Sequence, residues 1–462
     1  MRPVAALLAA LAAIDAHEEV GTGCKAGVDC KPPRGWRSWN CYADEVTQSR
    51  MMAIMDAFVD SSRGISLKDL GYIEVGLDDS YQLCRSGEHN SFHAWTNDRD
   101  KLVAMIDTRK FPDMKGMVDY AHERGLKAGF YANNCICMEM NYHKNEEIEA
   151  HYQGDAFDML HYGFDSIKLD GCGEFKDLER WQRTLNATGK YYAIESCHWG
   201  LDAPTREWCP YSYFRTSKDI KPTWFSVFKN LQTMHRFLEY PKALSRKGCW
   251  AYADMLEVGN LATYEENRSH FAAWAITSNP LILGLDVMDQ KTLDSVWDII
   301  SNEEILDINE VWAGHPGFFV KRQIAYFSPM LKGSAEERRM EELTEEQLAD
   351  LQAEPNLIAN IEGGMTQAWD YISHMYDQIQ IWAKPQPNGK LAVLVLNNAA
   401  WSARTRIRFK DLGFPGGDDA HVHVRCTYEH EDLGSFVGHI DINHLKSHDS
   451  RLYVLTPQAA AA

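Results

Sequence analysis

The sequence of 462 residues predicts an α/β fold, a (β/α)8 barrel (TIM barrel) followed by a C-terminal antiparallel β-sandwich domain. Between residues 33 and 290, short apolar segments alternate with amphipathic helical stretches. After about residue 310 the pattern changes to period-two alternation, separated by Gly, Pro and Asn turns. A doubly wound open sheet is the alternative for the first region, but no G-x-G-x-x-G motif follows an early strand.

Eight segments are predicted to form the barrel strands. They span residues 34–40, 72–79, 127–133, 165–171, 191–197, 213–217, 248–255 and 280–287. Helical segments such as FPDMKGMVDYAHERG and DLERWQRTL lie between them. Eight strands separated by helices over roughly 250 residues are typical of this barrel. We therefore assign residues 30–312 to it.

The C-terminal region is predicted to form a small antiparallel β domain over 317–333 and 377–458. Segments such as QIQIWAKPQPNGKLAVLVLNNA and HVHVRCTYEH show the required alternation. An acidic helical insert over 334–376 interrupts this domain. It begins with the capping box Ser334-x-x-Glu337, and we interpret its acidic residues as a solvated face rather than a site.

The first 16 residues, MRPVAALLAALAAIDA, have the pattern of a secretory signal peptide, with one cation, an apolar stretch and small residues. A mobile N-terminal helix is the alternative. Entry into the secretory pathway allows glycosylation at two sequons, Asn186 and Asn267. The 11 cysteines suit an oxidising compartment and predict disulfides with at least one thiol left over. Their spacing shows no zinc-site pattern.

The formal charge of −19 argues against nucleic acid or an anionic membrane as a partner, and favours a neutral ligand. Beyond the N-terminus, no segment reaches the roughly 18 apolar residues that a membrane span needs.

Polar residues gather at the carboxyl ends of the predicted strands, where the active site of a TIM barrel forms. These residues are Asp78, Asp79, Tyr131, Lys168, Asp170, Arg215 and Asp254. Candidate metal ligands are carboxylates without a Cys/His cluster, so the pattern favours no metal site. A G-x-S-x-G nucleophile elbow is absent. Abundant Asp at strand ends points instead to glycoside hydrolysis by a carboxylate pair.

Two aspartates are candidates for this pair. Lys168 and Asp170 lie two residues apart, so they share a strand face, and the cation favours the ionised form of a nucleophilic Asp170. A simple salt bridge at a strand end is the alternative interpretation. Asp219, just downstream of Arg215, is the candidate proton donor.

These motifs resemble the α-galactosidases of glycoside hydrolase family 27, particularly plant and algal members. The resemblance runs from about residue 33 to 457, in the same order throughout. It rests on the segments RGWRSWNCY, GYIEVGLDDSY, GFYAN, SIKLDGC, RTSKDI and WAYADML.

The resemblance implies that Asp170 is the nucleophile and Asp219 the general acid/base. It implies sugar-binding roles for Trp39, Asp78, Asp79, Tyr131, Lys168, Arg215 and Asp254. In the family the two adjacent aspartates hold the O4 and O6 hydroxyls of galactose, which implies the same roles for Asp78 and Asp79.

The resemblance also implies the disulfides Cys41–Cys84 and Cys197–Cys209, and a bond from Cys172 to Cys135 or Cys137. It places Asn186 at a common family glycosylation site. The chain departs from the family at His198, which stands where a Glu usually contacts the 2-hydroxyl. Tyr252 likewise replaces a usual acid, and the acidic insert is foreign to the family.

The activity implied is that of a secreted or vacuolar/lysosomal retaining exo-α-galactosidase, which needs no cofactor. An α-N-acetylgalactosaminidase or another α-glycoside hydrolase is the alternative within the family. A non-catalytic galactose-binding protein is the alternative of a different class. The sequence leaves the natural substrate and the oligomeric state open, with a homodimer as the candidate assembly.

Overall fold

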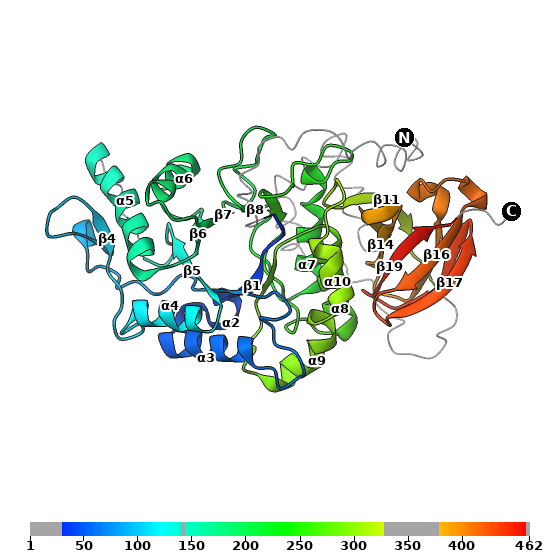
Figure 1. Cartoon of the computed structure of the whole chain (residues 1–462), viewed down its shortest axis with the longest axis horizontal. Coiled ribbons are helices and arrows are strands. Elements are labelled where there is room, and N and C mark those ends of the chain that lie inside the picture. Colours follow the sequence, from blue (N-terminus) through cyan, green and yellow to red (C-terminus); the bar gives the residue numbers. More distant parts are fainter. Residues whose placement is uncertain (1–29, 138, 140–143, 328–377, 459–462) are drawn as a thin grey trace.

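The computed structural model describes residues 30–137, 139, 144–327 and 378–458, which form a barrel and a smaller β domain at one end of the molecule (Figure 1). The predicted signal peptide (1–16) and acidic insert (334–376) lie outside the described residues.

A parallel eight-stranded sheet forms the centre of the larger domain, in the order β10-β1-β2-β5-β6-β7-β8-β9. A parallel bridge between Leu256 and Leu283 connects the segment after β9 to β10. The two end strands of the sheet therefore approach each other, and the sheet curls into a barrel. Each predicted barrel segment contains one of these strands, and the predicted fold class is confirmed. The strands are β1 (Arg34–Arg37), β2 (Glu74–Gly76), β5 (Lys127–Ala132), β6 (Ser166–Asp170), β7 (Ala193–Cys197), β8 (Tyr213–Arg215), β9 (Trp250–Tyr252) and β10 (Leu281–Leu283).

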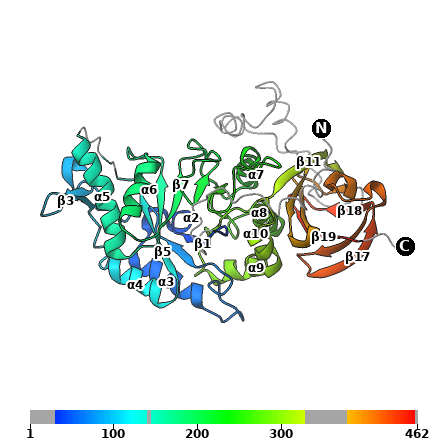
Figure 2. The same ribbon diagram turned by 45° about the horizontal axis from the view of Figure 1, so that its top comes forward.

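Helices pack around this sheet (Figures 1 and 2). Seven of them begin at a Thr, Asp or Asn whose side chain accepts a backbone N–H of the first turn, which satisfies a donor that the helix cannot. The other two, α2 and α5, begin without such a cap. The helices are α2 (Trp39–Tyr42), α3 (Gln48–Val59), α4 (Met114–Glu123), α5 (Asn145–Tyr162), α6 (Leu178–Ala187), α7 (Trp224–Gln232), α8 (Tyr264–Ile276), α9 (Gln290–Ile300) and α10 (Glu303–Glu310).

A two-stranded hairpin, β3 (His93–Trp95) and β4 (Leu102–Ala104), is inserted between β2 and β5, and the sequence did not predict it. The hairpin lies beside α5, at the end of the molecule far from the β domain (Figures 1 and 2). The backbone N–H of Ala104 donates to the buried Asp158 carboxylate over 2.8 Å, which ties hairpin to helix.

The β domain consists of a six-stranded sheet, β11-β13-β14-β19-β16-β17, and a three-stranded sheet, β12-β15-β18. All its strand pairs are antiparallel. Apolar side chains of both sheets share one core, as period-two alternation predicts. The strands are β11 (Phe318–Ile324), β12 (Tyr326–Phe327), β13 (Gln378–Pro385), β14 (Leu391–Asn397), β15 (Ala403–Arg408), β16 (His421–Cys426), β17 (Glu431–Val437), β18 (His439–Leu445) and β19 (Ser450–Pro457).

Short 3₁₀ helices fill several connections. They span Ala43–Glu45, Glu88–Asn90, His235–Phe237, Pro387–Gly389, Phe409–Leu412 and Gly417–Asp419.

Directed polar contacts join the two domains. The indole N–H of Trp224 donates to Asn398 over 2.7 Å, and the buried Lys384 amino group donates to the carbonyl of Asn309 over 2.8 Å at the end of α10. A donor at a helix C-terminus satisfies carbonyls that lack intrahelical partners. No helix among the described residues combines the length and apolar character that a membrane span needs.

Candidate active site

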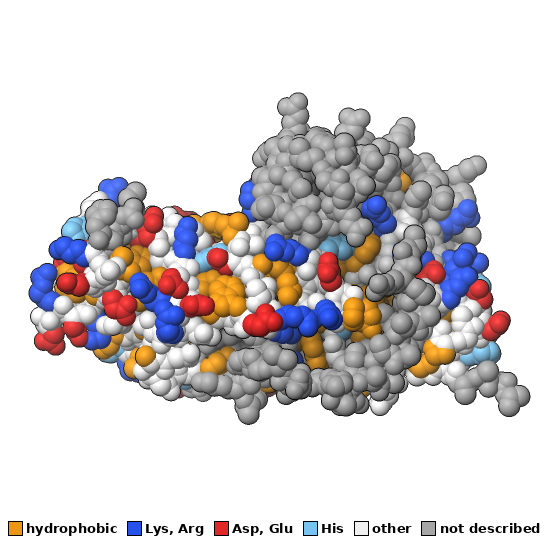
Figure 3. Space-filling view, turned by 90° about the horizontal axis from the view of Figure 1, so that it is seen from above, with side chains coloured by type: hydrophobic (Ala, Val, Ile, Leu, Met, Phe, Trp, Pro, Cys, Tyr) orange, Lys and Arg blue, Asp and Glu red, His pale blue; other side chains and the backbone are white. Residues whose placement is uncertain are grey.

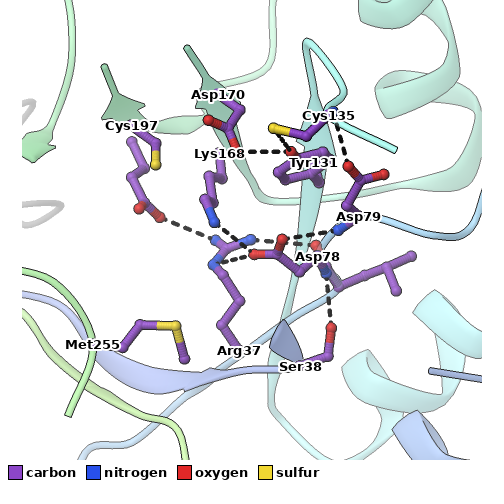
Figure 4. Close-up of polar contacts among 12 residues, drawn as sticks. Arg37, Ser38, Asp78, Asp79, Tyr131, Cys135, Lys168, Asp170, Cys197 and Met255 are labelled. Atoms are coloured by element: carbon purple, nitrogen blue, oxygen red, sulfur yellow. Dashed lines mark hydrogen bonds and ion pairs between the residues drawn. The ribbon is translucent and has the colours of Figure 1, made fainter. Parts of the chain in front are cut away.

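The sequence-predicted polar residues converge at the carboxyl ends of the barrel strands. Tyr131 lies in β5, Lys168 and Asp170 end β6, and Arg215 ends β8. The others occupy the loop or helix directly after a strand: Trp39 after β1, Asp78 and Asp79 after β2, His198 after β7, Asp219 after β8 and Asp254 after β9. Because the strands are parallel, these positions all lie at one edge of the barrel. Figure 4 draws five of them: Asp78, Asp79, Tyr131, Lys168 and Asp170.

Asp170 is held by two hydrogen bonds. The Tyr131 hydroxyl donates to Oδ2 over 2.7 Å (Figure 4). The backbone N–H of Gly171 donates to Oδ1 over 2.6 Å. The carboxylate is 7% exposed, so it is fixed in direction but reachable at the edge of the site.

Lys168 forms its ion pair with Asp78, with 2.9 Å between Nζ and Oδ2, and both side chains are buried. Among the described residues no ion pair joins Lys168 to Asp170, so the simple salt bridge considered from the sequence is wrong in its partner. Burial lowers the pKa of Lys168, but the charges of Asp78, Asp170 and Glu195 outweigh this and hold it well above its ordinary value. Lys168 is therefore a fixed cation beside the Asp170 carboxylate.

Arg37 lies beneath this pair and was missed by sequence reasoning. Its buried guanidinium lies 3.5 Å from Glu74, 3.4 Å from Glu195 and 4.0 Å from Asp78 (Figure 4 draws its contact with Asp78). Buried charges of opposite sign compensate one another only when all partners are in place. This network supports the floor of the site. The one available signal was the polar alternation Arg37, Glu74 and Glu195 in otherwise apolar strands.

Asp79 is positioned by the loop after β5. Its Oδ2 accepts the backbone N–H groups of Cys135 and Ile136 over 2.9 and 3.0 Å. Burial raises the pKa of Asp79 above its ordinary value, and these amide donors offset part of that rise. Asp78 is held separately, by Lys168, so the two adjacent carboxylates have different environments.

Asp219 and Asp254 share one cation. Arg215 Nη2 lies 2.8 Å from Asp254 and 3.0 Å from Asp219. Asp254 is buried, and its backbone has a φ of 86°, a left-handed conformation that is strained for a non-glycine residue. Burial raises the pKa of Asp254 despite Arg215.

The side chain of Asp219 is 71% exposed. Neighbouring atoms desolvate its carboxyl and raise its pKa, but the charges of Arg215 and Lys168 and hydrogen bonds from Arg215 and Trp199 bring it below its ordinary value. Asp219 thus occupies the open side of the site, as an ionised carboxylate paired with Arg215.

His198 is buried at the end of β7, with 3% exposed. Its Nδ1 forms a hydrogen bond with Asp202, which holds the ring in one orientation. Its Nε2 has no hydrogen-bond partner among the described residues. An imidazole held at one nitrogen can hydrogen-bond a hydroxyl with the other.

Two of the disulfides implied by the resemblance are wrong. Cys84 bonds to Cys137 instead of Cys41, and Cys209 bonds to Cys249 instead of Cys197. Cys172 bonds to Cys135, one of the two predicted partners. The bonds of Cys84 and Cys172 follow from the position of one loop. The loop after β5 carries Cys135 and Cys137 between the loops after β2 and β6, so it bonds to both.

Cys41 and Cys197, which lack the partners that the resemblance implies, are free cysteines. Cys197 is buried at the end of β7, where Arg215 Nη1 lies 3.3 Å from its Sγ, so it does not reach Cys209. Cys41 in α2 is half-buried, and burial raises the pKa of its thiol to about 12. Cys426 is also a free cysteine among the described residues.

The two predicted glycosylation sites differ. Asn186 is exposed near the end of α6. Asn267 is 5% exposed within α8, and its amide nitrogen donates to the carbonyl of Thr263 over 2.7 Å. A glycan attached to that nitrogen would replace this hydrogen bond at a buried position, so the structure favours Asn186 over Asn267 as the acceptor.

In the part of the chain that the structure describes, one group of metal-ligating type lies outside this site, formed by His93, His151 and Asp155 between the hairpin and α5. Within the site, Cys135, Cys172 and Asp170 also lie close together, but the two sulfurs are bonded to each other. Lys, Arg, Asp and Glu side chains are interspersed over the described surface in Figure 3, without a broad basic patch in that view.

Two family profiles match the chain. One, described as "Alpha galactosidase A", matches residues 31–311, and the other, described as "Alpha galactosidase C-terminal beta sandwich domain", matches residues 376–455. Alpha-galactosidase 3 from Arabidopsis thaliana is 29% identical over 452 residues, covering 94% of this chain and 84% of the relative. Alpha-galactosidase from Coffea arabica is 27% identical over 445 residues, covering 94% of this chain and 95% of the relative.

The solved structure of alpha-galactosidase I from Mortierella vinacea has the same fold. Its TM-score is 0.68 at 22% identity, and the superposition covers 95% of this chain and 100% of that one.

Proposed function

Because the chain belongs to the alpha-galactosidase family of glycoside hydrolases, we propose that it is a retaining exo-acting α-galactosidase that releases terminal α-linked D-galactose. One observation carries the mechanism. The Asp170 carboxyl group is oriented by two hydrogen bonds beside a buried cation, whereas Asp219 carries a second carboxyl group on the exposed side of the same strand ends.

In the first step, Asp170 attacks the anomeric carbon while Asp219, protonated in the substrate complex, donates its proton to the leaving glycosidic oxygen. The C1–O bond breaks, and a covalent galactosyl ester forms on Asp170. In the second step, Asp219 removes a proton from water, which attacks C1 and releases Asp170. Two inversions at C1 leave the α configuration unchanged.

Substrate binding is expected to change the protonation state of Asp219. Asp219 is ion-paired with Arg215, which favours its ionised form, whereas a general acid needs its proton. A sugar that hydrogen-bonds to Arg215 and excludes water weakens this pairing and raises the pKa of Asp219. Arg215 and Asp254 then serve as sugar ligands rather than as a closed ion pair.

The remaining contacts supply specificity. Asp78 and Asp79 accept hydrogen bonds from the O4 and O6 hydroxyls, and Trp39, half-buried in α2, packs on the apolar edge of the sugar. The unpartnered Nε2 of His198 hydrogen-bonds the 2-hydroxyl. A buried imidazole at this point leaves little room for an acetamido group, so galactose is preferred over N-acetylgalactosamine.

Hydrolysis of p-nitrophenyl α-galactoside and of its N-acetylgalactosamine analogue tests the proposal. We expect turnover of the first and little of the second. His198→Ala should shift the ratio toward the analogue. Galactose binding without turnover of any α-galactoside would instead favour a non-catalytic sugar-binding protein, and a preference for the analogue would favour an α-N-acetylgalactosaminidase.

Retention has its own test. Proton NMR during hydrolysis should show α-galactose first, followed by slow mutarotation. A galactose complex should place the Asp170 and Asp219 carboxyl groups about 5–6 Å apart. A first product in the β form, or a separation near 9 Å, would contradict the double displacement.

The location and assembly of the protein remain part of the proposal. A secretory signal at residues 1–16 leads to secretion or to a vacuolar/lysosomal compartment, and Asn186 is the sequon exposed for glycosylation. Loss of mobility shift on enzymatic deglycosylation of Asn186→Gln tests the glycan. Light scattering of the purified protein distinguishes monomer from homodimer.

A further inference from the structure

Five titratable side chains form a buried cluster between the β3–β4 hairpin and α5. His93 comes from β3, His151, Asp155 and Asp158 come from α5, and Glu139 comes from the segment before α5. Each is 7% exposed or less, and both imidazoles are 1% or less. None of these residues belongs to the strand ends that form the proposed sugar site. We call them the hairpin cluster.

Three members of the hairpin cluster have the geometry of metal ligands. One nitrogen of His93, one nitrogen of His151 and one oxygen of Asp155 all lie within 4.8 Å of one another. His93 Nε2 is 2.9 Å from Asp155 Oδ1, and His151 Nδ1 is 3.4 Å from Asp155 Oδ2. His151 and Asp155 are four residues apart, so α5 presents them on one face toward the hairpin.

Hydrogen bonds within the protein leave this cluster incomplete. Three buried polar atoms of the cluster have no hydrogen-bond partner among the described residues: Asp155 Oδ2, Glu139 Oε2 and His93 Nδ1. A buried carboxylate oxygen without a donor is costly, so such an atom in a closed polar cluster points to a missing partner. The positive partner that fits two imidazoles and a carboxylate is a metal ion.

We propose that His93, His151 and Asp155 bind one divalent transition-metal ion, of which Zn²⁺ is the best match. Zn²⁺ takes imidazole nitrogen and carboxylate oxygen in closed sites, whereas Ca²⁺ and Mg²⁺ prefer oxygen ligands alone. His151 binds through Nδ1, the nitrogen nearer to Asp155. Its Nε2 lies 3.9 Å from Glu139 Oε2, so Glu139 acts as the outer carboxylate that orients a metal-bound histidine.

Phe175 fixes the other face of this ligand. Its ring stacks on His151 with centroids 3.5 Å apart and planes within 9° of each other. His93 also lies against His151, with ring centroids 3.9 Å apart. These aromatic contacts hold the imidazoles in place.

The position of the hairpin cluster indicates a structural rather than a catalytic ion. Glu139 accepts from the Asn134 side chain over 2.8 Å, and the next residue, Cys135, donates its N–H to Asp79. The ion therefore joins the hairpin to α5 and, through Glu139, supports the loop that positions a sugar-site carboxylate. This role does not depend on the proposed hydrolase activity.

Metal content of the purified, untagged protein tests the site directly. After incubation with ZnCl₂ and gel filtration, we expect close to one Zn²⁺ per chain, and Co²⁺ loading should give a visible d–d spectrum of a four- or five-coordinate nitrogen–oxygen site. Less than about 0.1 equivalent of either ion, with the protein folded, would overturn the proposal.

Variants locate the ion. His93→Gln and His151→Gln should each lose at least nine-tenths of the bound metal and its thermal stabilisation. His161→Gln, at an exposed position of the same helix, is the matched control and should retain both. Metal that persists in the His93 and His151 variants would place it elsewhere and refute the assignment. If either variant fails to fold, the Co²⁺ spectrum and the melting temperature of the wild type with and without chelator still decide.

Discussion

The two sides of the proposed sugar site are built differently. On the β5–β6 side, Tyr131, Lys168 and Asp170 are buried, and each has a short hydrogen bond or ion pair inside the protein. On the β8–β9 side, Asp219 is 71% exposed and is paired with Arg215. A nucleophile needs a fixed direction and a constant charge, whereas a group that alternately gives and takes a proton needs a changeable environment. The proposed mechanism assigns the first requirement to the β5–β6 side and the second to the β8–β9 side.

The sharpest test of the β5–β6 side is Asp170→Asn. Turnover of p-nitrophenyl α-galactoside should fall by at least roughly four orders of magnitude, because the amide cannot form the ester. The new side chain keeps an oxygen for the Gly171 N–H, so the melting temperature should change little. Activity above about one per cent of wild type would remove Asp170 from the nucleophile role.

Asp219→Asn tests the β8–β9 side. We expect kcat to fall by about 10²–10⁴-fold for a substrate with a poor leaving group, and by much less for a dinitrophenyl galactoside, which needs no proton. Because the side chain is largely exposed, folding stability should be unaffected. Equal losses with both leaving groups would contradict the acid role.

Lys168→Met should show that the β5–β6 side also carries stability. Removing the cation leaves the buried Asp78 carboxylate with only Arg37 at 4.0 Å, which should cost about 3–5 kcal/mol in urea unfolding. Lys115→Met, which breaks an exposed pair with Asp119, is the control and should cost less than about 1 kcal/mol. Similar losses in the two variants would mean that burial does not distinguish these pairs.

Glu257, three residues after Asp254 on the β8–β9 side, should make the stability of the folded protein depend on pH. Burial raises its pKa to about 7, while Asn260 and Asn40 donate to it and offset part of the rise. Between the ordinary pKa near 4.5 and the folded value, the folded state binds a proton that the unfolded state has released, so stability falls as pH rises through this window.

Glu257→Gln places a permanently neutral side chain at this buried position and should therefore raise stability by about 1–3 kcal/mol at pH 8 while leaving it almost unchanged at pH 4.5. Urea unfolding of both proteins at the two pH values measures the difference. A variant that is equally destabilised at both would show that Glu257 is ionised in the folded protein.

The barrel strands could be predicted because each combines an apolar run with a polar end, and the order of the elements follows from alternation alone. The convergence of Asp78, Lys168, Asp170 and Arg215 was predictable for the same reason, since parallel strands end at one edge. Their partners were not. Lys168 is two residues from Asp170 in sequence, yet its ion pair is with Asp78, which follows β2 on the other side of β5.

Other differences between prediction and structure have the same origin in three-dimensional neighbours. From the sequence, Cys135 and Cys137 are both candidate partners of Cys172. Only the path of the loops shows that Cys135 bonds to Cys172 and Cys137 to Cys84. The Asn267 sequon contains no information on burial. The hairpin at 93–104 has strands of three residues each, too short for a periodic signal.

The paired disulfides of the loop after β5 have a consequence for where the protein can be made. Cys84–Cys137 and Cys135–Cys172 connect this loop to the loops after β2 and β6, which carry Asp79 and the Asp170 segment. Both bonds join loops at the strand ends rather than the strands themselves. We therefore expect a chain synthesised in a reducing cytosol, where such bonds are rare, to lose the fixed alignment of these loops.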